Sequence, residues 1–175
     1  MLYHHTSLGH LPYILMEGAL IPTIPQSDEW PADFVWATTD ERGDRTTGIC
    51  SHGREKRLPH VRIGLKPDLF LPWIEQADAA EWDMETRRRL IEYAVAMGQH
   101  ATNGWYACQE KVPVSELLSI EMKTWTTPWQ DITLDKVLAV EDDALTFEAG
   151  GRSWWAVRKL ADGRLHYICK EGEIE

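Results

Sequence analysis

The first twenty residues constrain the fold of this chain more than any other segment. Residues 2–6 read Leu-Tyr-His-His-Thr, which predicts a short strand. Ser7 is expected to be the N-cap of a helix that follows directly, and Gly18 fits the left-handed residue at which a helix ends. The apolar residues between them lie at helical spacing on one face: Leu8, Leu11, Ile14 and Leu15. Because adjacent histidines are poor core material, the strand is expected to floor a binding cleft.

Further strands and one long helix are predicted before residue 128. The strands are expected at 34–38, 60–65, 105–110 and 118–123. The helix is expected at 83–100, with Asp83 as its N-cap, Asn103-Gly104 as its stop and an apolar stripe of Met84, Leu90, Ile91, Ala94 and Met97. Residues 21–32 and 42–58 are expected to be loops, the second of them basic and mobile.

The last third of the chain has the pattern of an antiparallel meander. Four short strand-like runs occupy 136–140, 144–148, 153–159 and 164–169. Turn dipeptides separate them: Asp142-Asp143, Gly150-Gly151 and Asp162-Gly163. We therefore expect an α+β protein with a main domain at 1–128 and a C-terminal β-meander at 129–175, packed on the main domain.

Composition narrows the setting of the protein. The formal net charge of -10 argues against broad binding to a phosphate backbone. One local group of basic residues is the exception, and a solvated loop accounts for it equally well: Arg42, Arg45, Arg54, Lys56, Arg57 and Arg62. The 3 cysteines are odd in number and far apart, and no signal peptide or membrane span is predicted, so a cytoplasmic protein is expected.

Polar residues with chemical potential fall on three predicted strands: Tyr3-His4-x-Thr6, Trp36-Ala-Thr-Thr39 and Gln109-Glu110. With the helix that ends on glycine, this pattern resembles the ADP-ribosyltransferase-like family. The similar branch opens on a Tyr-His-x-Thr strand and includes DNA-targeting ADP-ribosyltransferase toxins and NAD-using tRNA phosphotransferases. The resemblance implies a split, mostly antiparallel sheet with flanking helices, and NAD as a substrate.

The resemblance also implies roles for individual residues. Glu110 would act at the ribose, where a carboxylate stabilises an oxocarbenium-like state or accepts a proton from the nucleophile. His4 would orient the nucleotide, and strand alternation places Thr6 on the same face as His4. Trp36 and Thr38 would line the nicotinamide side, and the basic group that includes Arg62 would hold the pyrophosphate or a nucleic-acid target. Tyr93 and Tyr106 are candidates for stacking on nicotinamide.

Several alternatives stay open. Glu110 reads equally as a solvated strand end, His4 as a semi-buried histidine, Trp36 as a core residue and Arg62 as an edge residue. The arginine-modifying branch of the family has an acidic residue where this chain has Cys108, so protein arginine is disfavoured as the acceptor. A nucleic acid or another protein side chain remains possible, and a toxin or phage conflict system is the setting by analogy alone.

Two rival functions follow from the same residues. An acidic, non-catalytic binding protein (an inhibitor or immunity factor) with this fold would suit the charge and the 9 tryptophans. An NAD-dependent RNA phosphotransferase would need several basic residues to hold its phosphate. The histidines lack metal-ligand spacing, so no metal site is expected.

Overall fold

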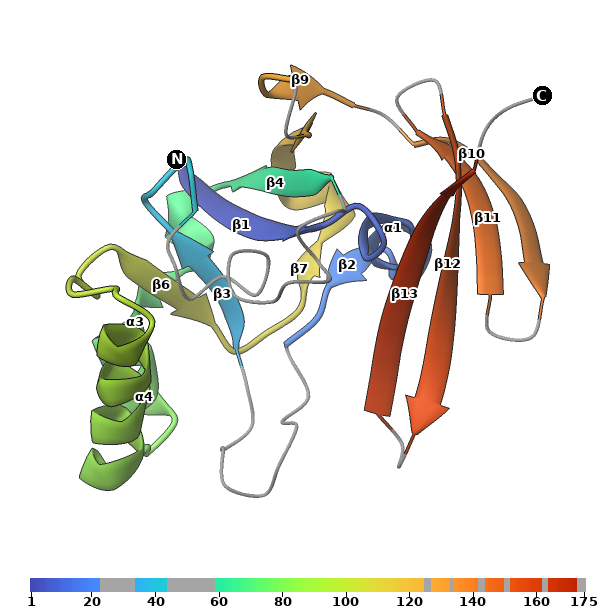
Figure 1. Cartoon of the computed structure of the whole chain (residues 1–175). Coiled ribbons are helices and arrows are strands. Elements are labelled where there is room, and N and C mark those ends of the chain that lie inside the picture. The colour runs from blue at the N-terminus through green and yellow to red at the C-terminus, as the bar shows by residue number, and fades with distance from the viewer. Residues whose placement is uncertain are drawn as a thin grey trace.

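A computed structural model describes residues 1–22, 34–43, 59–124, 127–132, 134–141, 144–149, 152–161 and 164–172. The protein has an α+β fold with mostly antiparallel sheets (Figure 1). The loops predicted at 21–32 and 42–58 lie almost entirely outside the described residues. No helix in the described part of the chain is long and apolar enough to span a membrane.

A seven-stranded sheet forms the centre of the protein, in the order β5-β6-β3-β1-β4-β8-β9. Its neighbouring strands all pair in antiparallel orientation. Its strands are β1 (Leu2–Ser7), β3 (Val35–Thr38), β4 (His60–Leu65), β5 (Leu71–Pro72), β6 (Trp105–Cys108), β8 (Leu117–Lys123) and β9 (Gln130–Asp131). The strand that carries the two adjacent histidines is therefore the central one.

Helix α1 (Leu11–Glu17) follows β1 after a short turn. It ends as predicted at Gly18, whose φ of 70° is the left-handed conformation that glycine adopts without steric cost. The N-cap prediction was wrong: Ser7 is the last residue of β1, and His10 is the N-cap, without a side-chain capping bond. Proline at the second helical position presets the backbone there, so the helix starts later than its apolar spacing predicted.

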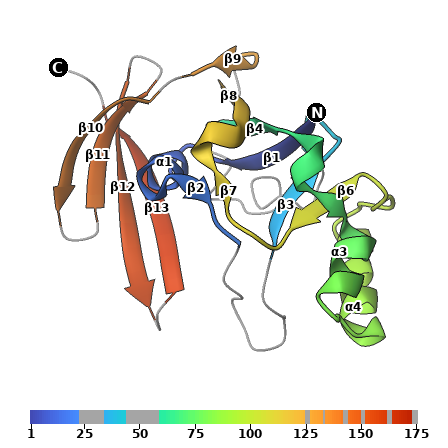
Figure 2. The ribbon, with the colours of Figure 1, turned by 180° about the vertical axis from the view of Figure 1, so that it is seen from behind.

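A second layer of helices covers one end of the sheet. Helix α3 (Trp73–Ala79) and helix α4 (Met84–Ala96) lie beside β6 in both views (Figures 1 and 2). Helix α3 was not predicted, because the prolines and acidic residues of its segment read as a loop. Asp83 caps α4 as predicted, by accepting a hydrogen bond from the Thr86 backbone N–H at 2.6 Å.

The predicted extent and apolar stripe of α4 were only partly right. Leu90 and Ala94 face inward, whereas Met84 and Ile91 are 77% and 41% exposed. The helix ends at Ala96, before a left-handed Gly98, and not at Asn103-Gly104.

The main hydrophobic core lies on the other side of the sheet. It joins residues of β1 and β4 to α1 and to the two-stranded sheet of β2 (Ala19–Leu20) and β7 (Val112–Pro113). The short 3-10 turns Pro67–Leu69 and Val114–Glu116 lead into β5 and β8.

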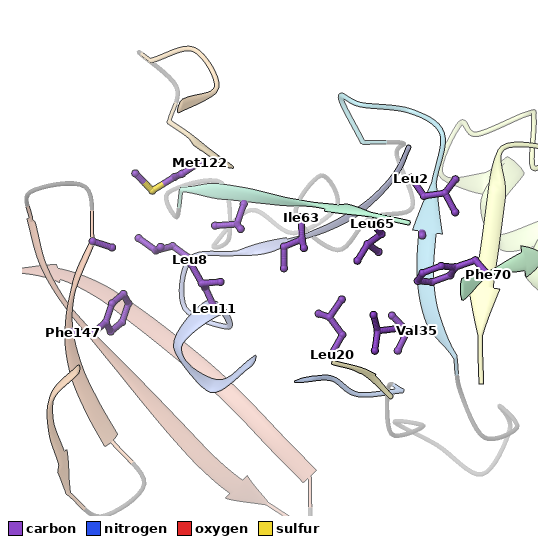
Figure 3. Packing of buried hydrophobic residues seen from close by; sticks show 14 residues of the cluster. Leu2, Leu8, Leu11, Leu20, Val35, Ile63, Leu65, Phe70, Met122 and Phe147 are labelled. Atoms are coloured by element: carbon purple, nitrogen blue, oxygen red, sulfur yellow. The ribbon is translucent and has the colours of Figure 1, made fainter. Parts of the chain in front are cut away.

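The four predicted C-terminal runs form one antiparallel sheet, in the order β10-β11-β12-β13. Its strands are β10 (Leu134–Glu141), β11 (Ala144–Ala149), β12 (Arg152–Ala161) and β13 (Arg164–Gly172). Phe147 and Ala149 of β11 belong to the main core, and Figure 3 shows Phe147 beside Leu8 and Leu11. This sheet therefore completes the core around α1.

Candidate functional site

The strand pairing divides the candidate residues between two faces of the central sheet. Antiparallel partners point to the same face, and neighbours along a strand point to opposite faces. His4 pairs with Ile63 of β4, so it points with Leu2 and Thr6 into the main core; we call this side the His4 face. Its opposite, the His5 face, carries the odd-numbered residues of β1: Tyr3, His5 and Ser7.

His4 is half-buried, and one of its two ring nitrogens forms a hydrogen bond within the protein. Its Nδ1–H donates to the backbone carbonyl of Trp36 at 2.9 Å, since a carbonyl oxygen only accepts. Burial lowers the pKa of His4, against a smaller raising effect of that hydrogen bond. The imidazole is therefore neutral, and its Nε2 carries a lone pair that accepts a hydrogen bond.

Thr6 and His10 extend the polar group around His4. Thr6 is 6% exposed, and its Oγ1 lies 2.9 Å from Nδ1 of His10. Ser7 Oγ lies 3.5 Å from the same nitrogen. Burial and the neighbouring His4 lower the pKa of His10 from 6.5 to about 4. The predicted pair His4 and Thr6 therefore does share one face, and His10 joins it from the N-terminus of α1.

Trp36 and Thr38 point away from His4. Thr38 pairs with Tyr3, which places both Thr38 and Trp36 on the His5 face. The Trp36 ring lies edge-on to Phe34 and Trp105, with ring centroids 5.6 and 6.1 Å apart, in the core under α3 and α4. Thr38 Oγ1 accepts from the Asp40 backbone N–H at 3.1 Å. Only the carbonyl of Trp36 reaches the His4 face, so neither side chain lines a site there.

Arg62 also lies on the His5 face, and its guanidinium is engaged by protein groups. It donates to both carboxylate oxygens of Glu121 at 2.8 Å and to the Glu41 carbonyl at 2.8 Å. Its side chain is 12% exposed and lies 4.4 Å from the centroid of the Trp129 ring. Arg62 therefore fastens β4 to β8 and to the turn after β3, and does not present a free charge to a pyrophosphate.

A second pair of histidines, His5 and His60, lies beside the turn that follows β3, and the sequence did not predict this pair. His5 Nε2–H donates to the Asp40 carbonyl at 3.0 Å, and Nδ1 of His5 forms a hydrogen bond with Nε2 of His60, also at 3.0 Å. Burial, together with the charges of His5, Lys123 and Arg62, lowers the pKa of His60 to about 3. Residues 5 and 60 are far apart in the chain, so no local sequence signal links them.

Glu110 lies just beyond β6, in the connection to β7. Its side chain is exposed, and its backbone carbonyl accepts a hydrogen bond from the Cys108 thiol at 3.5 Å. Tyr106 and Cys108 point to the His4 face, because Tyr106 pairs with Ala37 and Cys108 pairs with Val35. One strand, β3, separates β6 from β1, so neighbouring-strand spacing puts their backbones roughly 10 Å apart.

The sheet thus brings some of the predicted residues together and separates others. His4 and Thr6 share a face, and Glu110 follows a strand whose even-numbered residues, Tyr106 included, share it too. Tyr93 is 44% exposed on α4 and belongs to neither group. In the part of the chain that the structure describes, no three or more His, Cys, Asp or Glu residues gather as metal ligands would. No protein family, curated protein or solved structure was found to match this chain.

Proposed function

We propose that this protein is an NAD-dependent ADP-ribosyltransferase with an ADP-ribosyltransferase-like split sheet. In this proposal NAD is the substrate, His4 and Thr6 orient its adenosine half, and Glu110 acts at the ribose that carries nicotinamide. We leave Trp36, Thr38 and Arg62 out of the proposed site, because their side chains point to the His5 face. Tyr106 is the candidate on the His4 face for the ring of nicotinamide.

The observation that carries this proposal is the state of His4. Its Nδ1–H donates a hydrogen bond to the Trp36 carbonyl, and burial keeps the ring neutral by lowering its pKa. Among the described residues His4 has no second hydrogen-bond partner, so its Nε2 lone pair is left for a ligand. A ribose hydroxyl is a donor that such a lone pair binds without adding positive charge near a developing cation.

Glu110 would supply the charge that the reaction needs. The C1′–N bond to nicotinamide breaks, and its electron pair leaves on the nicotinamide nitrogen. The acceptor nucleophile then bonds to C1′, and its proton passes to the Glu110 carboxylate. An anionic carboxylate stabilises the oxocarbenium-like state between these events. The acceptor is a nucleic-acid base or a protein side chain, with arginine disfavoured because Cys108 replaces the second acid.

The test is release of nicotinamide from NAD, followed by chromatography. Wild-type protein is expected to release nicotinamide, and Glu110→Gln to lose about 100-fold or more in rate. The control Glu17→Gln removes another exposed carboxylate, at the end of α1, and is expected to leave the rate unchanged. His4→Ala is expected to raise the KM for NAD by about 10-fold, as the loss of one ligand hydrogen bond would, while His100→Ala does not. Wild-type protein that releases no nicotinamide with any acceptor tried contradicts the proposal.

A second candidate, the acidic non-catalytic binding protein, is favoured by one observation. The side chains predicted for the nicotinamide side lie in the aromatic core of the other face, so fewer groups surround the reacting bond than the resemblance implied. NAD binding without nicotinamide release, equal in wild type and Glu110→Gln, would favour this candidate. Absence of NAD binding as well would leave binding to a protein partner as its function.

A further inference from the structure

Helix α4 leaves most of its apolar side chains outside the core of the protein. Of its 13 residues only Ala94 is buried, and Leu90 packs partly against the aromatic core. Met84, Ile91 and Val95 are 77%, 41% and 46% exposed. The helix lies at the outer edge of the protein in both views (Figures 1 and 2). Exposed apolar side chains that gather in one place mark an interaction surface.

These exposed side chains lie on one line along the helix. With Arg88 between them, Met84, Ile91 and Val95 follow the alternating four- and three-residue spacing by which one helix packs along another. At 1.5 Å of rise per residue this line is about 16 Å long. We call Met84, Arg88, Ile91 and Val95 the α4 stripe. Its spacing indicates that the partner it fits is another helix.

Charged residues of both signs run along one side of the α4 stripe. Arg88 donates to Glu85 at 2.6 Å and to Glu92 at 2.5 Å, and Arg89 donates to Glu85 at 3.2 Å. The helix as a whole has three arginines and two glutamates, so it is locally positive in a chain whose net charge is -10. Two copies of an acidic protein repel each other least where both present such a segment.

We propose that two copies of this chain pair through the α4 stripe, with their α4 helices antiparallel about a two-fold axis. The axis passes between Arg88 and Ile91, so that Met84 of each copy packs against Val95 of the other. This pairing covers all three exposed apolar side chains of the stripe at once. The proposal is independent of the reaction proposed above, because none of these residues belongs to the His4 group.

Charge complementarity favours a second copy as the partner and fixes its direction. In the antiparallel register Arg88 lies level with Ile91 of the other copy, and about 1.5 Å along the axis from its Glu92. A two-fold axis perpendicular to the helices keeps the same side of both together, so Arg88 and Glu92 of the two copies form two reciprocal pairs. A parallel pair would instead bring Arg88 against Arg88, which repels.

The size of the interface determines how tightly the copies associate. One helix of 13 residues per copy provides an interface at the low end of the range for protein–protein contacts, below about 1,200 Å² in total. The dimer is therefore reversible, and its population depends on protein concentration.

The first test is sedimentation velocity of the full chain over a range of concentrations. Wild-type protein is expected to pass from monomer to dimer as concentration rises, and Ile91→Glu to raise the dissociation constant about 10-fold or more. The matched control is Tyr93→Gln, since Tyr93 is 44% exposed on the same helix and points away from the α4 stripe. It is expected to change the dissociation constant by less than about 2-fold. Circular dichroism of each variant shows whether its helices are intact.

The second test is a charge swap, which a general loss of stability does not reproduce. Arg88→Glu places like charges against Glu92 of the other copy and is expected to raise the dissociation constant about 10-fold. Combining Arg88→Glu with Glu92→Arg reverses both members of each pair. The double variant is expected to return to within about 3-fold of wild type.

Three results would overturn the proposal. One is wild-type protein that stays monomeric at every concentration, whether or not it binds a different protein through α4. Another is a dimer that Ile91→Glu and Tyr93→Gln weaken equally, which would place the contact on another surface. The third is a double charge-swap variant that associates as weakly as Arg88→Glu alone, because the antiparallel pairing of Arg88 with Glu92 would then be wrong.

Discussion

Acid is expected to destabilise the folded protein through His10, and the size of the effect follows from its surroundings. The pKa of His10 falls from 6.5 to about 4 in the folded chain, because burial and His4 disfavour the protonated ring. The unfolded chain therefore binds more protons than the folded chain between these two values. Stability that is fully present above pH 6.5 is lost as the pH falls toward 4, and the loss levels off below the folded pKa.

The magnitude comes from the linkage relation for a single site. With these two pKa values, lowering the pH from 7.5 to 5.0 costs about 2 kcal/mol of unfolding free energy, an order-of-magnitude figure. The limiting value, reached below pH 4, is about 3 kcal/mol. A loss of this size is a substantial part of the total stability of a typical domain.

The assay is urea unfolding of wild-type protein and His10→Gln at both pH values, followed by tryptophan fluorescence. Other histidines, His60 among them, titrate in both proteins, so the difference between the two isolates His10. The variant is expected to be less stable than wild type at pH 7.5, because it loses the hydrogen bond between Thr6 and the His10 ring. That deficit is expected to shrink by about 2 kcal/mol, or to reverse, at pH 5.0. A deficit that is the same at both pH values would refute the reasoning, because His10 would then have no depressed pKa.

Three further predictions concern residues outside the His4 group. Trp36→Ala is expected to cost about 3 kcal/mol in chemical denaturation, because it removes a partly buried ring that packs against the aromatic core; a cost below about 1 kcal/mol would contradict this packing. Arg62→Ala and Glu121→Ala are each expected to destabilise more than half as much as the double variant, with a coupling energy above about 1 kcal/mol. Strictly additive losses would mean that the ion pair contributes nothing. Asp83→Ala is expected to lower stability by about 1 kcal/mol through loss of the cap on Thr86, with the Kd for NAD unchanged.

Local features of the fold were predictable from the sequence. Strand alternation placed His4 and Thr6 on one face, Gly18 marked the end of α1, and the turn dipeptides marked the hairpins of the C-terminal sheet. Each of these rests on residues a few positions apart, where backbone geometry alone decides the outcome.

The composition of the site was not predictable in the same way. Whether Trp36 points to the face of His4 depends on the register of β3 against β1, and a shift of one residue reverses every side chain of a strand. The partner of Arg62 lies 59 residues later in the chain, so its charge looked available when it was already neutralised. Long-range pairing, and not propensity, therefore decided which of the predicted residues belong together.

The central position of β1 sets the order in which this protein can assemble. Its two neighbours, β3 and β4, lie about 35 and 60 residues later in the chain, so the strand that carries His4 has no partner while it leaves the ribosome. At a translation rate of roughly 5–20 residues per second, it waits about 3 to 12 s for β4. The entropic cost of closing loops of this length is incurred before strand pairing contributes any stabilisation. His4 is thus synthesised before both strands that position it. We therefore expect His4 to become competent to bind a ligand only after the central sheet has formed.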